Sequence, residues 1–163
     1  MGRQLARRLD IPFLDSDHAI EQRLGCSIRE YFERQGEERF RDIETEVLAQ
    51  LVLQGQGVLS TGGGSVLREQ NRDLLRQNGQ VFYLHTSPQE VFRRLRHDQQ
   101  RPLLQVDDPK HKIRQLFEER DPHYQAAAHF VIETSRPRIP TMITMIISQL
   151  ELAGLLPIET AAP

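Results

Sequence analysis

The segment that most constrains the fold is Val58–Gly64, where a short run of strand-forming residues leads directly into three consecutive glycines. Glycine loses more chain entropy on folding than any other residue, so three in a row indicate a loop where the backbone approaches something closely. In an α/β sheet the loop that follows a strand lies at the carboxyl edge, where ligands bind. The segment therefore predicts a ligand-facing loop, and its alternative is a flexible surface turn.

Helical and strand-like segments alternate along the rest of the chain, which predicts a layered α/β domain. The expected strands cover residues 11–14, 58–61, 81–84 and 129–133. The expected helices cover residues 2–9, 19–24, 38–53, 68–77, 87–97, 110–120 and 140–152, with a further helix that begins with a capping box at Ser27 and Glu30. The length of 163 residues suits one domain, expected at residues 1–155 and followed by a tail at 156–163.

Composition excludes several classes of protein. The net charge of −2 provides no electrostatic attraction to nucleic acid or to a membrane surface, and there is no membrane-spanning apolar run or signal peptide. Cys26 is the only cysteine, and the six histidines lack zinc-binding spacing, so neither an internal disulfide nor a zinc cluster is expected. These features fit a cytoplasmic protein without a nucleic-acid or membrane partner.

Two carboxylates, Asp15 and Asp17, follow the first expected strand. Carboxylates at the carboxyl edge of a strand can bind Mg²⁺ through its water ligands, or accept a proton from a reacting hydroxyl. The structural alternative is that Asp17 caps the next helix and Asp15 stabilises the turn.

Three arginines are candidates for binding an anion. Arg41 lies three residues before Glu44 in a helix, so Glu44 could hold its guanidinium, although this spacing is more typical of a surface salt bridge. Arg101 opens Arg101–Leu104 between two helices, where an arginine can close over a ligand and stabilise developing phosphate charge, or simply be solvated in a linker. Arg120, near the end of a helix, could bind an anion or complement the helix dipole.

The order and spacing of these segments together resemble those of the shikimate kinase family. The resemblance extends from Gly2 to about Ile147 and depends on Asp15–Asp17, Phe40–Glu44, Thr61–Gly64, Arg101–Leu104 and Glu119–Tyr124. The triple glycine combined with Arg-Pro-Leu-Leu distinguishes this family from other small-molecule kinases of the same fold. The resemblance implies a three-layer phosphate-loop kinase fold, with a parallel sheet flanked by helices. It also implies a monomeric enzyme that phosphorylates shikimate to shikimate 3-phosphate in aromatic amino acid biosynthesis, with ATP as co-substrate and Mg²⁺ as cofactor.

The resemblance also implies roles for individual residues in binding shikimate. Asp17 would bind the shikimate hydroxyls and take the proton of the attacking one, while Arg41 and Arg120 would grip the carboxylate. The backbone of Gly63, flanked by Gly62 and Gly64, would contact the ring hydroxyls. These residue types suit a small anion that bears several hydroxyls.

The same resemblance implies which residues handle ATP. Asp15 would face Mg²⁺ through water, and Arg94 would pack against adenine. Arg101 would act on the transferring phosphate from a lid at about residues 98–110. No adenine contact is assigned after the last strand, because Pro137 falls near its usual place.

The chain departs from the family in one major respect, because none of its residues match the phosphate loop G-x-x-x-x-G-K-[ST]. The family opens with an apolar strand and this loop, and Gly2–Ala6 aligns with the helix just after it. The sequence therefore predicts a sheet that lacks its first central strand, and a truncated chain that is inactive and poorly folded as written.

Two other functions remain as alternatives. One is a different small-polyol kinase of the same fold, such as gluconate kinase, against which the paired Arg41 and Arg120 and the triple glycine argue. The other is a non-catalytic shikimate-binding remnant, which the missing phosphate loop favours. Asp17 and Arg101, which would serve in phosphate transfer, argue against the remnant.

Overall fold

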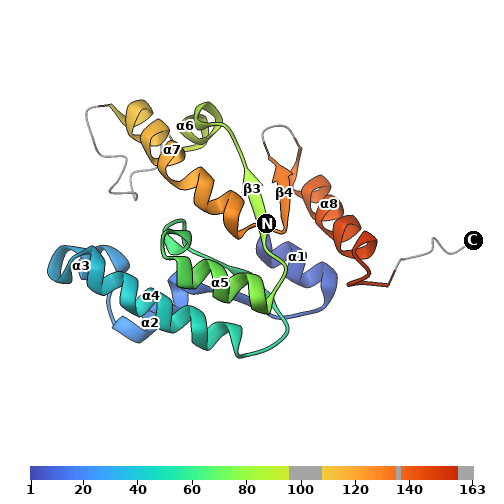
Figure 1. Ribbon diagram of the computed structural model, residues 1–163, viewed down its shortest axis with the longest axis horizontal. Helices are drawn as coiled ribbons and strands as arrows, with labels where there is room; N and C mark the ends of the chain where they lie inside the picture. Colours follow the sequence, from blue (N-terminus) through green and yellow to red (C-terminus); the bar gives the residue numbers. More distant parts are fainter. Residues whose placement is uncertain (96–107, 135–136, 158–163) are drawn as a thin grey trace, which may run out of the picture.

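The computed structural model describes residues 1–95, 108–134 and 137–157 (Figure 1). In these residues the helices are α1 (Gly2–Leu9), α2 (Ser16–Leu24), α3 (Ile28–Gln35), α4 (Glu37–Val52), the 3₁₀ turn η1 (Ser65–Leu67), α5 (Glu69–Asn78), α6 (Pro88–Leu95), α7 (Pro109–Ala127) and α8 (Ile139–Leu152). The strands are β1 (Phe13–Asp15), β2 (Val58–Ser60), β3 (Phe82–His85) and β4 (Phe130–Glu133). The alternating α/β order expected from the sequence is confirmed.

The strands form two parallel pairs. Phe13 is in register with Val58 in the β1–β2 pair, and Phe82 is in register with Phe130 in the β3–β4 pair. Within the described ranges β2 and β3 are not hydrogen-bonded to each other, so the sheet is divided into two halves. This division agrees with the expectation of a parallel sheet without a central strand.

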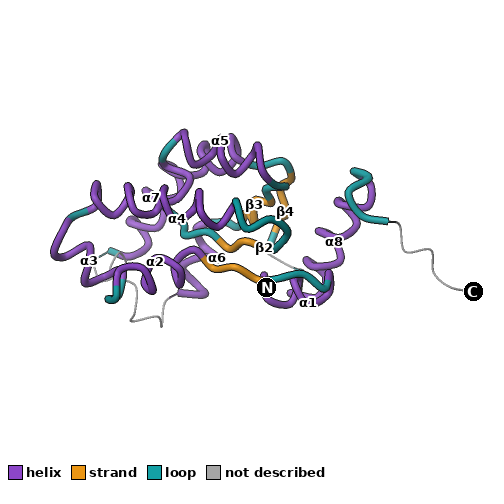
Figure 2. Tube along the Cα trace, turned by 90° about the horizontal axis from the view of Figure 1, so that it is seen from below, coloured by secondary structure: helices purple, strands orange, loops and turns teal. Residues whose placement is uncertain are grey.

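An apolar cluster spans the two halves. Leu5 of α1 and Ile146 of α8 are buried in it, and Val58 of β2 and Phe82 of β3 pack against its edge. Figure 2 shows α1 and α5 on opposite sides of the strands, as expected for a layered α/β domain. Burial of these side chains holds together strands that share no hydrogen bonds.

A second apolar cluster joins α2, α3 and α4. Ile20, Phe40 and Val47 are buried there, and the rings of Phe32 and Phe40 lie 4.4 Å apart. This cluster fixes the first turns of α4 near the carboxyl ends of β1 and β2, where Arg41 is located. No helix among the described residues is long and apolar enough to cross a membrane.

Helix α7 extends farther than the sequence predicted. The expected end at residue 120 is wrong, because the helix continues through Pro122 to Ala127. A proline inside a helix removes one backbone hydrogen bond. Arg76 of α5 caps the end of the helix, where its Nη1 donates to the carbonyl oxygens of Ala126 and Ala128 at 3.2 and 2.8 Å.

Candidate functional site

The site begins where β1 meets α2. Asp15 is the N-cap of α2, and its Oδ1 accepts hydrogen bonds from the backbone N–H groups of Asp17 and His18 at 3.1 and 3.3 Å. The alternative in which Asp17 supplies the cap is therefore wrong. The Asp17 carboxylate instead lies against the glycine loop, residues Gly62–Gly64. A methyl carbon added at Gly62 would be 2.6 Å from Asp17 Oδ1.

The glycine loop is crowded by functional side chains. A methyl group at Gly64 would overlap the guanidinium of Arg41, and one at Gly63 would lie 3.3 Å from the Tyr124 hydroxyl. Gly62–Gly64 all have negative φ angles, so these residues are glycine to leave space rather than to allow a left-handed backbone. The alternative of a loose surface turn is wrong, and the close approach to the backbone is confirmed.

Arg41 and Glu44 form a buried pair, so the surface salt bridge suggested by their spacing is wrong. Arg41 Nη1 donates to Glu44 Oε2 at 2.7 Å, and the Glu44 side chain is only 1% exposed. The other carboxylate oxygen accepts from Ser65 Oγ at 2.8 Å, and Glu37 binds Arg41 Nη2 at 2.9 Å. Burial alone lowers the pKa of Arg41, but the two carboxylates outweigh this effect and raise it.

Arg120 approaches the glycine loop from α7. Its Nη1 donates to the Gly63 carbonyl oxygen at 3.3 Å, and its Nε is buried without a hydrogen-bond partner among the described residues. Arg41 and Arg120 therefore both lie against Gly62–Gly64, Arg41 at Gly64 and Arg120 at Gly63. A buried N–H with no acceptor is costly, and an anion bound at this point would satisfy it.

Tyr124 is a site residue that the sequence analysis missed. Its hydroxyl donates to the Gly63 carbonyl oxygen at 2.6 Å. Tyr124 follows Arg120 by four residues on the same helix, a spacing that places both side chains on one face. That spacing was the available signal, but it carries no information about which residue the hydroxyl contacts.

The residues expected to handle ATP are only partly described. Arg94 Nη2 donates to the carbonyl oxygen of Thr134, directly after β4, at 2.7 Å. Arg101 and most of the expected lid lie outside the described residues, which resume at Asp108, and Pro109 and Lys110 already belong to α7.

Asp15 fits a cation that takes most of its ligands from elsewhere. The described residues contain no group of three or more His, Cys, Asp or Glu side chains that could hold a metal ion. Mg²⁺ usually keeps several waters and is bound by one or two carboxylates together with substrate phosphates. A single carboxylate at this edge of the sheet suits that mode of binding.

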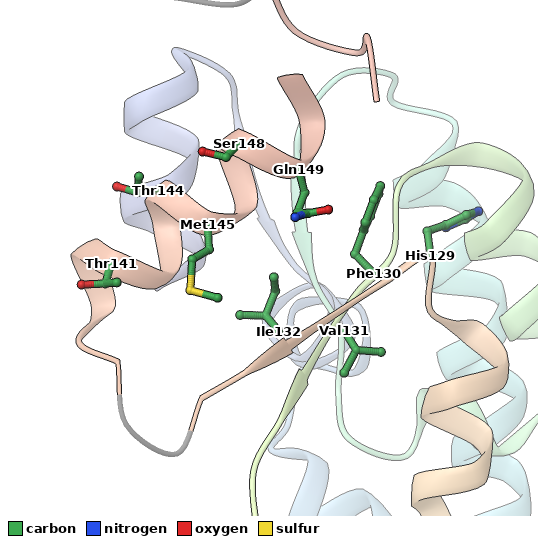
Figure 3. A pocket seen from close by; sticks show the side chains of 9 residues that line it. All are labelled: His129, Phe130, Val131, Ile132, Thr141, Thr144, Met145, Ser148 and Gln149. Atoms are coloured by element: carbon green, nitrogen blue, oxygen red, sulfur yellow. The ribbon is translucent and has the colours of Figure 1, made fainter. Parts of the chain in front are cut away.

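A cavity of about 500 Å³ lies away from this cluster, between β4 and α8 (Figure 3). Val131, Thr144, Met145 and Ser148 are among the residues that line it, and it contains none of the predicted site residues. Its lining among the described residues consists of apolar and uncharged polar side chains together with His129. The cavity therefore lacks the arginine and lysine side chains that bind phosphate or carboxylate.

Comparisons with known proteins agree with this geometry. The family model described as "Shikimate kinase" matches residues 1–151. The shikimate kinase of Paracidovorax citrulli is 54% identical over 160 residues, which cover 96% of this chain and 87% of that protein. The shikimate kinase of Burkholderia thailandensis is 51% identical over 155 residues, which cover 95% of this chain and 84% of that protein.

Solved structures give the same result. The shikimate kinase of Acinetobacter baumannii in complex with shikimate has a TM-score of 0.86 and 42% identity, and the match covers 95% of this chain and 86% of that one. The shikimate kinase of Bacteroides thetaiotaomicron has a TM-score of 0.81 and 30% identity, with 95% and 90% covered. On this evidence the chain belongs to the shikimate kinase family.

Proposed function

We propose that Asp17, Arg41, Arg120 and the glycine loop Gly62–Gly64 form the shikimate site of this protein. A shikimate kinase transfers a phosphate of ATP to shikimate, in the biosynthesis of aromatic amino acids. The observation that carries the proposal is the approach of two guanidiniums and one carboxylate to the same three glycines. The solved relative from A. baumannii is described as a complex with shikimate, which supports this assignment.

The two arginines suit the carboxylate of shikimate. Glu44 and Glu37 hold the Arg41 guanidinium in one orientation, so little side-chain entropy is lost when the substrate binds. Arg120 offers the same anion its Nε–H, which has no hydrogen-bond partner in the part of the chain that the structure describes. Charge-assisted hydrogen bonds of this kind are about twice as strong as neutral ones.

Asp17 suits the hydroxyl side of the substrate. Its carboxylate lies beside Gly62, while Ser16 Oγ accepts the Gly62 backbone N–H at 3.0 Å and fixes the loop beside it. A carboxylate at this point can accept the hydroxyl proton as the oxygen attacks the phosphate. Because Gly62–Gly64 carry no side chains, Asp17 and the two arginines can lie directly against the backbone that would face the substrate ring.

For the phosphate donor we propose ATP with Mg²⁺, which would be held in part by Asp15 through water. Bound Mg²⁺ supplies charge neutralisation to the phosphates. Arg94 beside Thr134 suits the adenine end of the nucleotide. From the sequence, we propose that Arg101 stabilises the charge that develops on the transferring phosphate.

We further propose a monomeric cytoplasmic enzyme whose kinase domain covers residues 1–155. The net charge of −2 supports a protein without a nucleic-acid partner. Shikimate and ATP are then the only partners that the reaction needs.

Calorimetric titration tests the substrate assignment. The protein should bind shikimate in preference to gluconate, and Arg41→Ala should weaken shikimate binding roughly ten- to a hundredfold, because a charge-assisted hydrogen bond contributes about 1.5–3 kcal/mol. Arg29→Ala is the matched control, since Arg29 forms an ion pair with the exposed Glu33. Preference for gluconate, or equal affinity of the Arg41→Ala and Arg29→Ala variants, would overturn the proposal.

A further inference from the structure

Tyr124 has a contact that the shikimate site does not itself require. Two donors from α7 meet the Gly63 carbonyl oxygen: the Tyr124 hydroxyl at 2.6 Å and Arg120 Nη1 at 3.3 Å. A carbonyl oxygen has two lone pairs and can accept both bonds. The shorter bond is the one made by tyrosine, so the carbonyl depends on Arg120 only weakly.

The Tyr124 ring is held firmly in place. It stacks on the ring of Tyr83 with centroids 4.9 Å apart, and the Tyr83 hydroxyl donates to Asp121 Oδ1 at 2.7 Å. Burial raises the pKa of Tyr124, so its hydroxyl stays protonated at neutral pH and keeps its donor. Strand β3 and helix α7 together therefore present a fixed phenol to the glycine loop.

We propose that Tyr124 is a positioning residue for recognition of the substrate carboxylate, because it holds the Gly63 carbonyl and leaves the Arg120 guanidinium available to the substrate. The inference rests on the proposed function of Arg120. Without the phenol, Arg120 would be the only donor to this carbonyl among the described residues. The guanidinium would then be drawn toward the protein and away from the anion.

Calorimetric binding of shikimate to a double-mutant cycle tests this role. Tyr124→Phe removes one hydroxyl and should weaken binding about three- to tenfold, the range expected for one hydrogen bond. In an Arg120→Ala background the same change should alter affinity less than twofold, because there is no guanidinium left to misplace. Tyr31→Phe, on α3 in the second apolar cluster, is the matched control and should bind shikimate like the wild type.

Each outcome is decisive. Equal loss in both backgrounds would assign Tyr124 a general structural role, and unchanged affinity would show that it has no role in binding; either result overturns the inference. A wild-type protein that does not bind shikimate would contradict the proposed function instead. NMR of the ¹⁵N-labelled arginine side chains gives a second readout: the Arg120 Nε–H signal of the free protein should move in Tyr124→Phe but not in Tyr31→Phe, and an unmoved signal would also overturn the inference.

Discussion

At the scale of single residues, the three glycines act by leaving space for other side chains. Gly64→Ala should push the Arg41 guanidinium away from the loop and weaken shikimate binding roughly tenfold, or about 1.4 kcal/mol. Folding stability should fall as well, because the displaced guanidinium is the partner of the buried Glu44. Gly79→Ala is the control, since Gly79 is extended with φ −166° and its nearest atom to an added methyl carbon, Leu75 O, is 3.8 Å away. Calorimetry that finds equal affinities for the two variants would contradict this argument.

The buried Glu44 should matter for both stability and binding. Glu44→Gln keeps the shape but removes the charge that faces Arg41, so we expect unfolding free energy to fall by about 1.5–3 kcal/mol. Shikimate affinity should fall as well, because Arg41 loses its orientation. Urea unfolding and calorimetry measure the two effects, with Glu33→Gln as the exposed control. A stability equal to that of the control would mean that the pair contributes no more than a surface ion pair.

The sequence predicted which residues belong to the candidate site better than it predicted their burial and their contacts. The spacing of Arg41 and Glu44 correctly indicated a pair, but burial of the pair depends on Ser65, which is distant in sequence and packs over it. Likewise the carboxylates after the first strand were found, while the assignment of the helix cap to Asp15 depends on the local backbone angles. Long-range contacts such as Tyr124 to Gly63 leave no periodic signal in a single sequence.

At the scale of elements, the β3–β4 pair begins with a contact that depends on pH. The backbone N–H of Val81 donates to His129 Nδ1 at 3.1 Å, which requires that nitrogen to be unprotonated. Partial loss of hydration, assisted by the positive charge of Arg76, lowers the pKa of His129. The unfolded chain therefore takes up the proton first as pH falls.

His129 therefore stabilises the folded protein more at neutral than at acidic pH. The contribution of His129 to stability is fully present above the unfolded pKa of about 6.5 and is lost as pH falls below it, toward the lower folded pKa. His129→Asn keeps an acceptor and does not titrate, so its thermal midpoint should decline less than that of the wild type between about pH 7.5 and about pH 5.5. His111→Asn, at an exposed position of α7, should decline like the wild type. A parallel decline in all three proteins would show that His129 is not responsible.

Element positions were largely predictable, because apolar periodicity and caps are local signals. The capping box of Ser27 and Glu30 is present as expected. The end of α7 was not predictable, because the helix continues past Pro122 and its last carbonyl oxygens are bound by Arg76 of another helix.

At the scale of the whole molecule, the division of the sheet is the main feature. In residues 1–95, 108–134 and 137–157 the inner edges of β2 and β3 are not paired with each other, and the apolar cluster around Leu5 joins the two halves. The proposed shikimate residues are distributed across both halves. Asp17 lies in α2, which begins directly after β1, and Arg41 lies in α4. Arg120 and Tyr124 belong to α7, which packs with β3. The affinity for shikimate therefore reports on whether the halves are held in the correct relative position.

A crystal structure of this protein with shikimate tests the central claim most directly. The account predicts that the carboxylate lies between the guanidiniums of Arg41 and Arg120, with Arg120 Nε as a donor and a ring hydroxyl at Asp17. Shikimate bound in the cavity between β4 and α8, or bound at Gly62–Gly64 with its carboxylate away from both arginines, would contradict it.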